Sequence, residues 1–256
     1  MTRKVKKKVL VLLLMSTVLY SKAQQDTKIL IAAASDMKFA LDSVIVAFKQ
    51  SHLGVQVDVT YGSSGKLYEQ ISNDAPFDLF FSADAGYPLK LKEKGVAISA
   101  IQTYGIGRIV VWSKKINPAL TGINSLLDKS VIKIAIANPA HAPYGRGAEE
   151  ALKFYKIYDQ LKGKLVYGEN ISQTAQFVAA GAADIGIIAL SLALSPTMQK
   201  QKGYFYLTPE IAHKPLEQAF VVLRHASKNS LAVSFANFMA TKEAIRILSH
   251  FGYTKK

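Results

Sequence analysis

The stretch that decides the fold is residues 28–61, KILIAAASDMKFALDSVIVAFKQSHLGVQVDVTY. It begins with an apolar run, Lys28–Ala34, that predicts a buried strand. From Asp36 to Gln50 apolar residues recur every three or four positions, which predicts a helix with one buried face. Residues 55–61 alternate between apolar and polar side chains, as a second strand does. Strand, helix and strand in this order are typical of a βαβ unit in a parallel sheet.

The alternation of strands and helices continues along the chain, so we predict an α/β fold. The element order restarts near residue 132, which favours two lobes, each a mostly parallel sheet flanked by helices. After residue 61 we expect helices over 65–72, 87–94, 145–155, 172–180 and 230–248, and strands over 77–81, 108–112, 132–137, 164–167, 184–189 and 218–223, with a bend at Gly105 and Gly107.

No Pro-, Gly- or Ser-rich linker separates the two halves of the sequence. We therefore expect the chain to cross between the lobes through strands, near 108–112 and 218–223. This assigns 24–107 and 224–256 to lobe 1 and 108–223 to lobe 2. Both ends of the exported chain would then belong to lobe 1.

The N-terminus has the three parts of a secretory signal peptide: a basic segment over 3–8, an apolar run over 9–18 and small residues at Ser21 and Ala23. We predict cleavage after Ala23 and a periplasmic location. The sequence has no cysteine, so a lipid anchor on an N-terminal cysteine is excluded. Removing the first 23 of 256 residues leaves 233, and removing six basic residues from the net charge of +14 leaves +8.

Several classes of function lack their sequence signals. The lysines of the exported chain are scattered rather than interleaved with aromatic residues, so we expect no nucleic-acid partner. The five histidines show no paired metal-ligand spacing. Lys66 stands where a Gly-x-Ser-x-Gly nucleophile elbow centred on Ser64 needs glycine. We expect no enzyme activity, and a secreted serine hydrolase that uses Ser64 is the competing hypothesis.

Polar residues gather at four predicted strand-to-helix junctions. Such junctions lie at the carboxyl ends of parallel strands, where ligands bind. A helix start leaves backbone N–H groups unpaired and attracts anions. Donors from both lobes therefore predict a cleft for a small oxyanion, although a serine at a helix start also serves as a cap that contributes about 1 kcal/mol. The junctions are Ser35–Asp36, Ser63–Ser64, 138–145 and 168–172.

These same junctions resemble those of the periplasmic molybdate-binding proteins of ABC importers. The stretches APFDLFFSAD, residues 75–84, and NPAHAPYG, residues 138–145, are the most specific parts of the resemblance. It implies a two-lobed periplasmic-binding fold of type II that closes on molybdate, and in most members on tungstate. It further implies a monomer without a cofactor that delivers the anion to a membrane permease. The segments that carry it are 31–35, 61–67, 75–84, 136–145 and 184–191.

The resemblance also implies the ligand-binding residues. The first two would donate through hydroxyl and backbone N–H groups, and the next two through the backbone. Some members have a tyrosine at the fifth position, so its alanine here removes a hydroxyl that Ser191 or the Tyr144 hydroxyl would have to replace. The five positions are Ser35, Ser64, Tyr144, Ile171 and Ala189.

Three further expectations concern the same region. Sulfate or a small organic acid is the alternative ligand, and an organic acid would need Arg146 to turn into the cleft. We expect Asp84 to cap the helix that follows it. Asp78 is expected at the surface or packed between the lobes.

Overall fold

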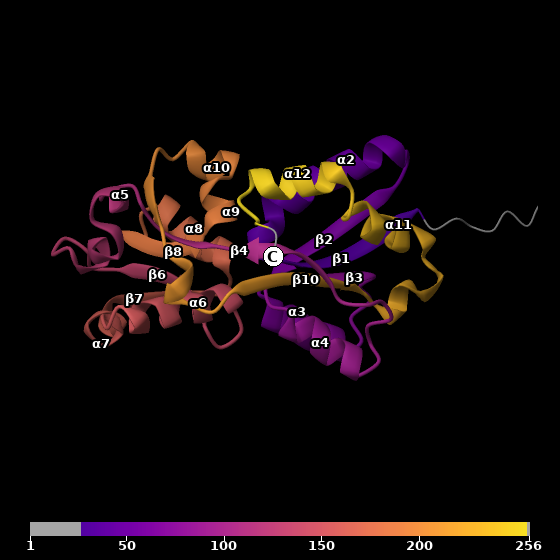
Figure 1. The fold of residues 1–256 in the computed structure, drawn as a ribbon, viewed down its shortest axis with the longest axis horizontal. Helices are drawn as coiled ribbons and strands as arrows, with labels where there is room; N and C mark the ends of the chain where they lie inside the picture. Colours follow the sequence, from indigo (N-terminus) through magenta and orange to yellow (C-terminus); the bar gives the residue numbers. More distant parts are fainter. Residues whose placement is uncertain (1–26, 255–256) are drawn as a thin grey trace, which may run out of the picture.

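The computed structural model describes residues 27–254, so the predicted signal peptide, 1–23, lies outside the described residues. Two lobes lie end to end along the longest axis of the molecule, each built on one five-stranded sheet (Figure 1). The predicted two-lobed α/β architecture is confirmed. Within the described range, no helix combines the length and the apolar character needed to cross a bilayer.

The sheet of lobe 1 has the strand order β2-β1-β3-β10-β4. The central strand β1 pairs in parallel with β2 and β3, and β10 runs antiparallel to β3 and β4. The register places Ala34 opposite Gly62, so β1 and β2 end at the same edge. The strands are β1 (Lys28–Ala34), β2 (Gln56–Gly62), β3 (Leu79–Ser82), β4 (Gln102–Gly107) and β10 (Leu216–Val222).

The sheet of lobe 2 repeats this arrangement, in the order β7-β6-β8-β5-β9. Here β6 pairs in parallel with β7 and β8, while β5 is antiparallel to β8 and β9. In each sheet, one antiparallel strand therefore interrupts a parallel set. The strands are β5 (Ile109–Ser113), β6 (Ile134–Ala137), β7 (Leu165–Gly168), β8 (Ile185–Ala189) and β9 (Tyr204–Leu207).

Helices cover both sheets. Lobe 1 has η2 (Ser35–Met37), α2 (Lys38–Ser51), α3 (Ser64–Ser72), α4 (Gly86–Glu93), η6 (Arg224–Lys228), α11 (Ser230–Phe238) and α12 (Lys242–His250). Lobe 2 has α5 (Pro118–Thr121), η3 (Gly122–Leu127), α6 (Pro143–Phe154), α7 (Tyr158–Leu161), η4 (Lys162–Lys164), α8 (Ile171–Ala179), α9 (Leu190–Ala193) and α10 (Pro196–Gln199), with η5 (Glu210–Ala212) near its end.

Each lobe has its own apolar core. In lobe 1, Leu41 and Phe48 of α2 pack with Phe235 of α11 against the sheet. In lobe 2, Trp112 of β5 and Leu152 of α6 belong to a second cluster. A few apolar residues of lobe 1, Ala34, Ala83 and Phe39, also pack against the cluster of lobe 2, beside the polar groups at the strand ends.

The structure differs from the predicted elements in two places. The expected bend at Gly105 and Gly107 is an edge strand, β4, which pairs with β10. The single helix expected over 230–248 is two helices, α11 and α12. Their break is set by Thr241, whose Oγ1 accepts a hydrogen bond from Ala244 N at 3.3 Å and so caps α12. The apolar spacing continues through the break and therefore does not reveal it.

The path of the chain between the lobes also differs from the expectation. It leaves lobe 1 at Arg108, between β4 and β5, and returns between β9 and β10. Strand β10 belongs to the sheet of lobe 1, so the boundary that we placed at 223 moves to the segment 208–215. The sequence of a buried apolar strand is compatible with either sheet. Only the hydrogen-bonded pairing of β10 with β3 and β4 shows which lobe it belongs to. The two crossings are joined because Arg108 Nη1 lies 2.7 Å from Glu210 Oε1 and Nη2 donates to Thr208 O.

Asp78 is a buried anchor of lobe 1 rather than a surface residue; its side chain is only 3 % exposed. Its Oδ2 accepts hydrogen bonds from Leu30 N at 2.8 Å and from Asn229 Nδ2 at 3.1 Å. Its Oδ1 lies 2.9 Å from His225 Nδ1. The carboxylate thus holds strand β1 against the segment of lobe 1 that follows β10.

We predict that Asp78→Ala lowers the free energy of unfolding by about 2–4 kcal/mol, because buried N–H groups lose their acceptor. Urea unfolding followed by circular dichroism measures this change. Asp159→Ala is the matched control, since Asp159 forms an exposed ion pair with Lys162, and surface ion pairs contribute little. Equal unfolding midpoints for the two variants would contradict the role of Asp78.

Candidate binding site between the lobes

Four helix starts meet at one small cavity between the lobes. Lobe 1 contributes the starts of η2 and α3, which follow β1 and β2, and lobe 2 contributes the starts of α6 and α8, which follow β6 and β7. These are the carboxyl ends of parallel strands. The lining residues are Ala34, Ser35, Asp36, Gly62, Ser63, Ser64, Ala83, Ala142, Pro143, Tyr144 and Ile171.

The structure brings four of the five predicted ligand-binding residues to this cavity. Ser35 and Ser64 reach it from lobe 1, and Tyr144 and Ile171 from lobe 2; all four are buried. The fifth, Ala189, is not among the lining residues, and is buried at the end of β8, just before α9.

Ser64 is placed to donate its hydroxyl proton. It is the first residue of α3 and fully buried, and its Oγ accepts a hydrogen bond from Ala83 N at 3.0 Å. An oxygen that accepts in this way keeps its own proton for another partner. A serine hydrolase would need a histidine hydrogen-bonded to Ser64 as its general base. Among the described histidines, His141 is hydrogen-bonded to the neighbouring Ser63 and not to Ser64.

Ser35 is shared between the lobes. Its Oγ donates to Asn170 Oδ1 at 3.1 Å and accepts from Ser172 N at 3.3 Å, both at the start of α8. Ser172 Oγ donates to Ser35 O at 2.8 Å. Neither Ser35 nor Ser64 caps its own helix: the cap positions are Ala34 and Ser63, and neither side chain makes a capping hydrogen bond.

Further contacts hold the lobes together around the cavity. Gly65 N donates to His141 O at 2.9 Å, and His141 Nδ1 lies 2.9 Å from Ser63 Oγ. Ion pairs join Lys66 to Glu169 and Asp84 to Arg146 across the same gap. The space left inside is about 10 Å³, room for about one water molecule. The lobes are therefore in a closed arrangement.

The lining residues include no lysine, arginine or histidine. Arg146 turns away from this cavity, since its guanidinium pairs with Asp84 and Tyr87. The candidate partner of an organic carboxylate is thus absent from the lining. Asp84 Oδ1 also accepts from Gly86 N at 2.7 Å, but the cap position of α4 is Ala85, so Asp84 stands one residue before the cap that we expected it to be. What the cavity offers an anion is hydroxyl groups and helix starts.

Asp36 is the residue of this site that sequence reasoning missed. It is fully buried beside Ser35, and its Oδ2 accepts from Tyr253 OH at 2.7 Å and from Tyr144 OH at 3.1 Å. Burial raises the pKa of Asp36 to about 7, and the hydrogen bonds from the tyrosines offset part of that rise. In the sequence, an acid in the first turn of a helix suggests only an ordinary charge near the helix dipole.

The two hydroxyls that we considered as replacements at position 189 are both directed to Asp36. Tyr144 OH donates to its carboxyl, and Ser191 Oγ donates to its backbone oxygen at 2.9 Å. The hydroxyl of Tyr144 is therefore occupied, but its backbone, at the start of α6, can still face the cavity.

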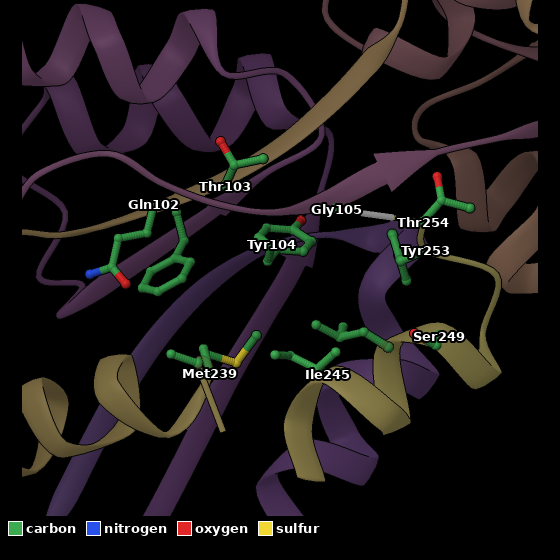
Figure 2. A pocket seen from close by; sticks show the side chains of 12 residues that line it. Gln102, Thr103, Tyr104, Gly105, Met239, Ile245, Ser249, Tyr253 and Thr254 are labelled. Carbon is green, nitrogen blue, oxygen red and sulfur yellow. The ribbon is translucent and has the colours of Figure 1, made fainter. Parts of the chain in front are cut away.

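The tyrosines around Asp36 belong to a larger polar cluster. Gln218 Nε2 donates to Tyr144 OH at 3.3 Å, and Tyr104 OH donates to Gln218 Oε1 at 2.9 Å. Burial raises the pKa of Tyr104, Tyr144 and Tyr253 well above the ordinary value. Tyr104 and Tyr253 also line a separate groove of about 380 Å³, between β4 and the helices α11 and α12 (Figure 2).

Comparisons with known proteins agree over almost the whole described chain. A family model of bacterial extracellular solute-binding proteins matches residues 29–254. The molybdate-binding protein ModA of Rhodobacter capsulatus is 36% identical over 202 residues, which are 78% of this chain and 78% of that protein. ModA of Azotobacter vinelandii is 31% identical over 234 residues, 90% of this chain and 91% of that protein.

The fold agrees with a solved relative as well. The periplasmic molybdate-binding protein of Azotobacter vinelandii superposes with a TM-score of 0.81 at 30% identity, and the match covers 89% of this chain and 99% of that one. The two-lobed α/β fold of this chain is thus a known architecture. The chain belongs to the family of bacterial extracellular solute-binding proteins, and within it resembles the molybdate-binding proteins of ABC importers.

Proposed function

We propose that this protein binds molybdate, and also tungstate, as a dianion held between the lobes. The observation that carries the proposal is the meeting of Ser35, Ser64 and the starts of α6 and α8 at one cavity whose lining includes no cation. The molybdate-binding relatives, at 31–36% identity, support the choice of ligand.

Uncharged donors can hold such an anion. A hydrogen bond to a charged group contributes roughly 1.5–3 kcal/mol, so several donors together offset a large cost of dehydration. A tetrahedral oxyanion is larger than the present space of about 10 Å³. We therefore expect the lobes to be slightly further apart around the anion, with the Ser35 hydroxyl turned to it from Asn170.

Binding would proceed by capture and closure. The starts of α3 and α6 lie in different lobes, so the anion meets its full set of donors only when both lobes contact it. Contacts made in one arrangement alone shift the equilibrium towards that arrangement. The two crossings, at Arg108 and 208–215, are the natural hinge because only they connect the lobes within the described chain.

The proposed route follows from the predicted leader. The chain would be exported, cleaved after Ala23 and released without a lipid anchor into the periplasm. There the closed monomer, without a cofactor, would dock on an ABC importer permease, where opening of the lobes releases the anion.

Isothermal titration of the cleaved protein tests the ligand. We expect heat of binding with molybdate and with tungstate, which match in charge and nearly in size. Sulfate is smaller and should bind at least tenfold more weakly, since uncharged donors spaced for a larger ion do not all reach it. Binding of sulfate or of an organic acid alone would overturn the assignment in favour of those ligands.

We predict that Ser64→Ala raises the dissociation constant for molybdate by about 10- to 150-fold, the equivalent of one lost hydrogen bond to a charged group. Titration calorimetry measures the change. Ser234→Ala is the matched control, because Ser234 lies on α11 and bonds only to Ser230 O. An unchanged affinity in Ser64→Ala would remove Ser64 from the site. Labelling of Ser64 by a fluorophosphonate would instead support the hydrolase hypothesis.

We also predict that Gly65→Ala weakens molybdate binding by about tenfold or more, because overpacking at a tight contact costs about 1–3 kcal/mol. A Cβ atom at Gly65 would lie 2.7 Å from His141 O, across the gap between the lobes. Small-angle scattering with molybdate should then show a more open particle than the wild type. Gly163→Ala is the control, since a Cβ there meets nothing within 4 Å. Wild-type affinity in Gly65→Ala would mean that binding does not require this approach of the lobes.

A further inference from the structure

We propose that anion binding is coupled to the uptake of one proton, and that Asp36 is the group that takes it up when the lobes close. The inference rests on the proposed function, because it assigns a role to a residue of the same cavity. It goes beyond the ligand by making the affinity depend on pH.

The surroundings of the Asp36 carboxyl fit a protonated acid. The side chain is fully buried, and Oδ2 accepts from two phenol groups. Oδ1 has no hydrogen-bond partner among the described residues. A buried carboxylate with one bare oxygen is costly, whereas a proton on Oδ1 removes the charge. Protonation would also convert Oδ1 from an acceptor into a donor beside the anion site.

Among residues 27–254, no cation on the elements packed against Asp36 balances a charge on its carboxyl. The titratable groups that face it are phenols: Tyr144 from α6, Tyr253 from the segment after α12, and Tyr104 from β4, whose pKa is raised by burial and by the charge of Asp36. The other neighbours, Ser191 of α9 and Gln218 of β10, are uncharged. The nearest lysine in sequence, Lys38 of α2, pairs with Asp42.

A dianion in the cavity would further favour the protonated form of Asp36, because a nearby like charge raises the pKa of a carboxyl group. Asp36 and the anion would share one lining, so their charges would face each other in a space from which water is excluded. The neutral form of Asp36 is therefore the form compatible with a bound dianion.

Opening of the lobes reverses the effect. Tyr144 and Ser191 belong to lobe 2 and Asp36 to lobe 1, so opening removes both contacts and admits water. The open form should then have a pKa near the ordinary value of about 3.9, against about 7 in the closed form. Between these values closure binds a proton, so the dissociation constant for the anion should rise by up to about tenfold for each pH unit gained.

Calorimetry of molybdate binding at pH 6.5, in two buffers with different ionisation enthalpies, measures proton uptake directly. We expect close to one proton per anion in the wild type. Asp36→Asn keeps an acceptor for the phenols and is neutral at every pH, so it should bind with almost no proton uptake and with an affinity that is flat between pH 6 and 8.

His141 is the matched control, because its imidazole is a second candidate proton acceptor beside the cavity, 2.9 Å from Ser63 Oγ. His141→Gln should retain the proton uptake of the wild type. If Asp36→Asn does not fold, the pH dependence of the molybdate dissociation constant is compared between wild type and His141→Gln. Both should show the same rise of the dissociation constant with pH. Molybdate binding without proton uptake, or uptake lost in His141→Gln, overturns this inference and leaves the proposed function standing. Absence of molybdate binding at every pH overturns both.

Discussion

The constraint on which the rest of the structure depends is the unpaired backbone N–H at the start of a helix. Such a group needs a partner, and the strand order of each sheet places two helix starts at the same edge. Two lobes facing each other at these edges bring the starts of η2, α3, α6 and α8 to one point. An anion there satisfies donors from both lobes at once, which is why the arrangement suits a receptor that closes.

The same edges explain how the lobes remain separable. Each lobe buries most of its apolar core by itself, and only a few lobe 1 residues in the described chain, such as Ala34, Ala83 and Phe39, pack against the core of lobe 2. Many of the remaining contacts between the lobes are hydrogen bonds and ion pairs, such as those of Ser35 with Asn170 and of Arg146 with Asp84. Water can replace such contacts when the lobes part, whereas exposing an apolar core would cost about 25 cal/mol for each Å².

Asp36 connects the proposed anion site with the region of the proposed hinge. Asp36 follows Ser35 in the chain, and its carboxyl accepts a hydrogen bond from Tyr253. The next residue, Thr254, forms a β-bridge with Ile106 of β4, close to the crossing at Arg108 (Figure 1). The tyrosines keep this acid buried without a counterion. The Asp36 carboxyl thus contacts Tyr144 of α6 and Tyr253 near the C-terminal end of the described chain, and its backbone oxygen contacts Ser191 of α9.

Much of the architecture could be predicted from the sequence, because apolar periodicity records which face of each element is buried: β1, α2 and the restart at β6 all followed from it. The junction residues Ser35, Ser64, Tyr144 and Ile171 were identified by their place in the chain and by resemblance. Tertiary structure alone decided that β10 returns to lobe 1, since an apolar strand suits either sheet. It alone decided the environment of Asp36, because residues 108 and 217 positions away supply the phenols that bury it.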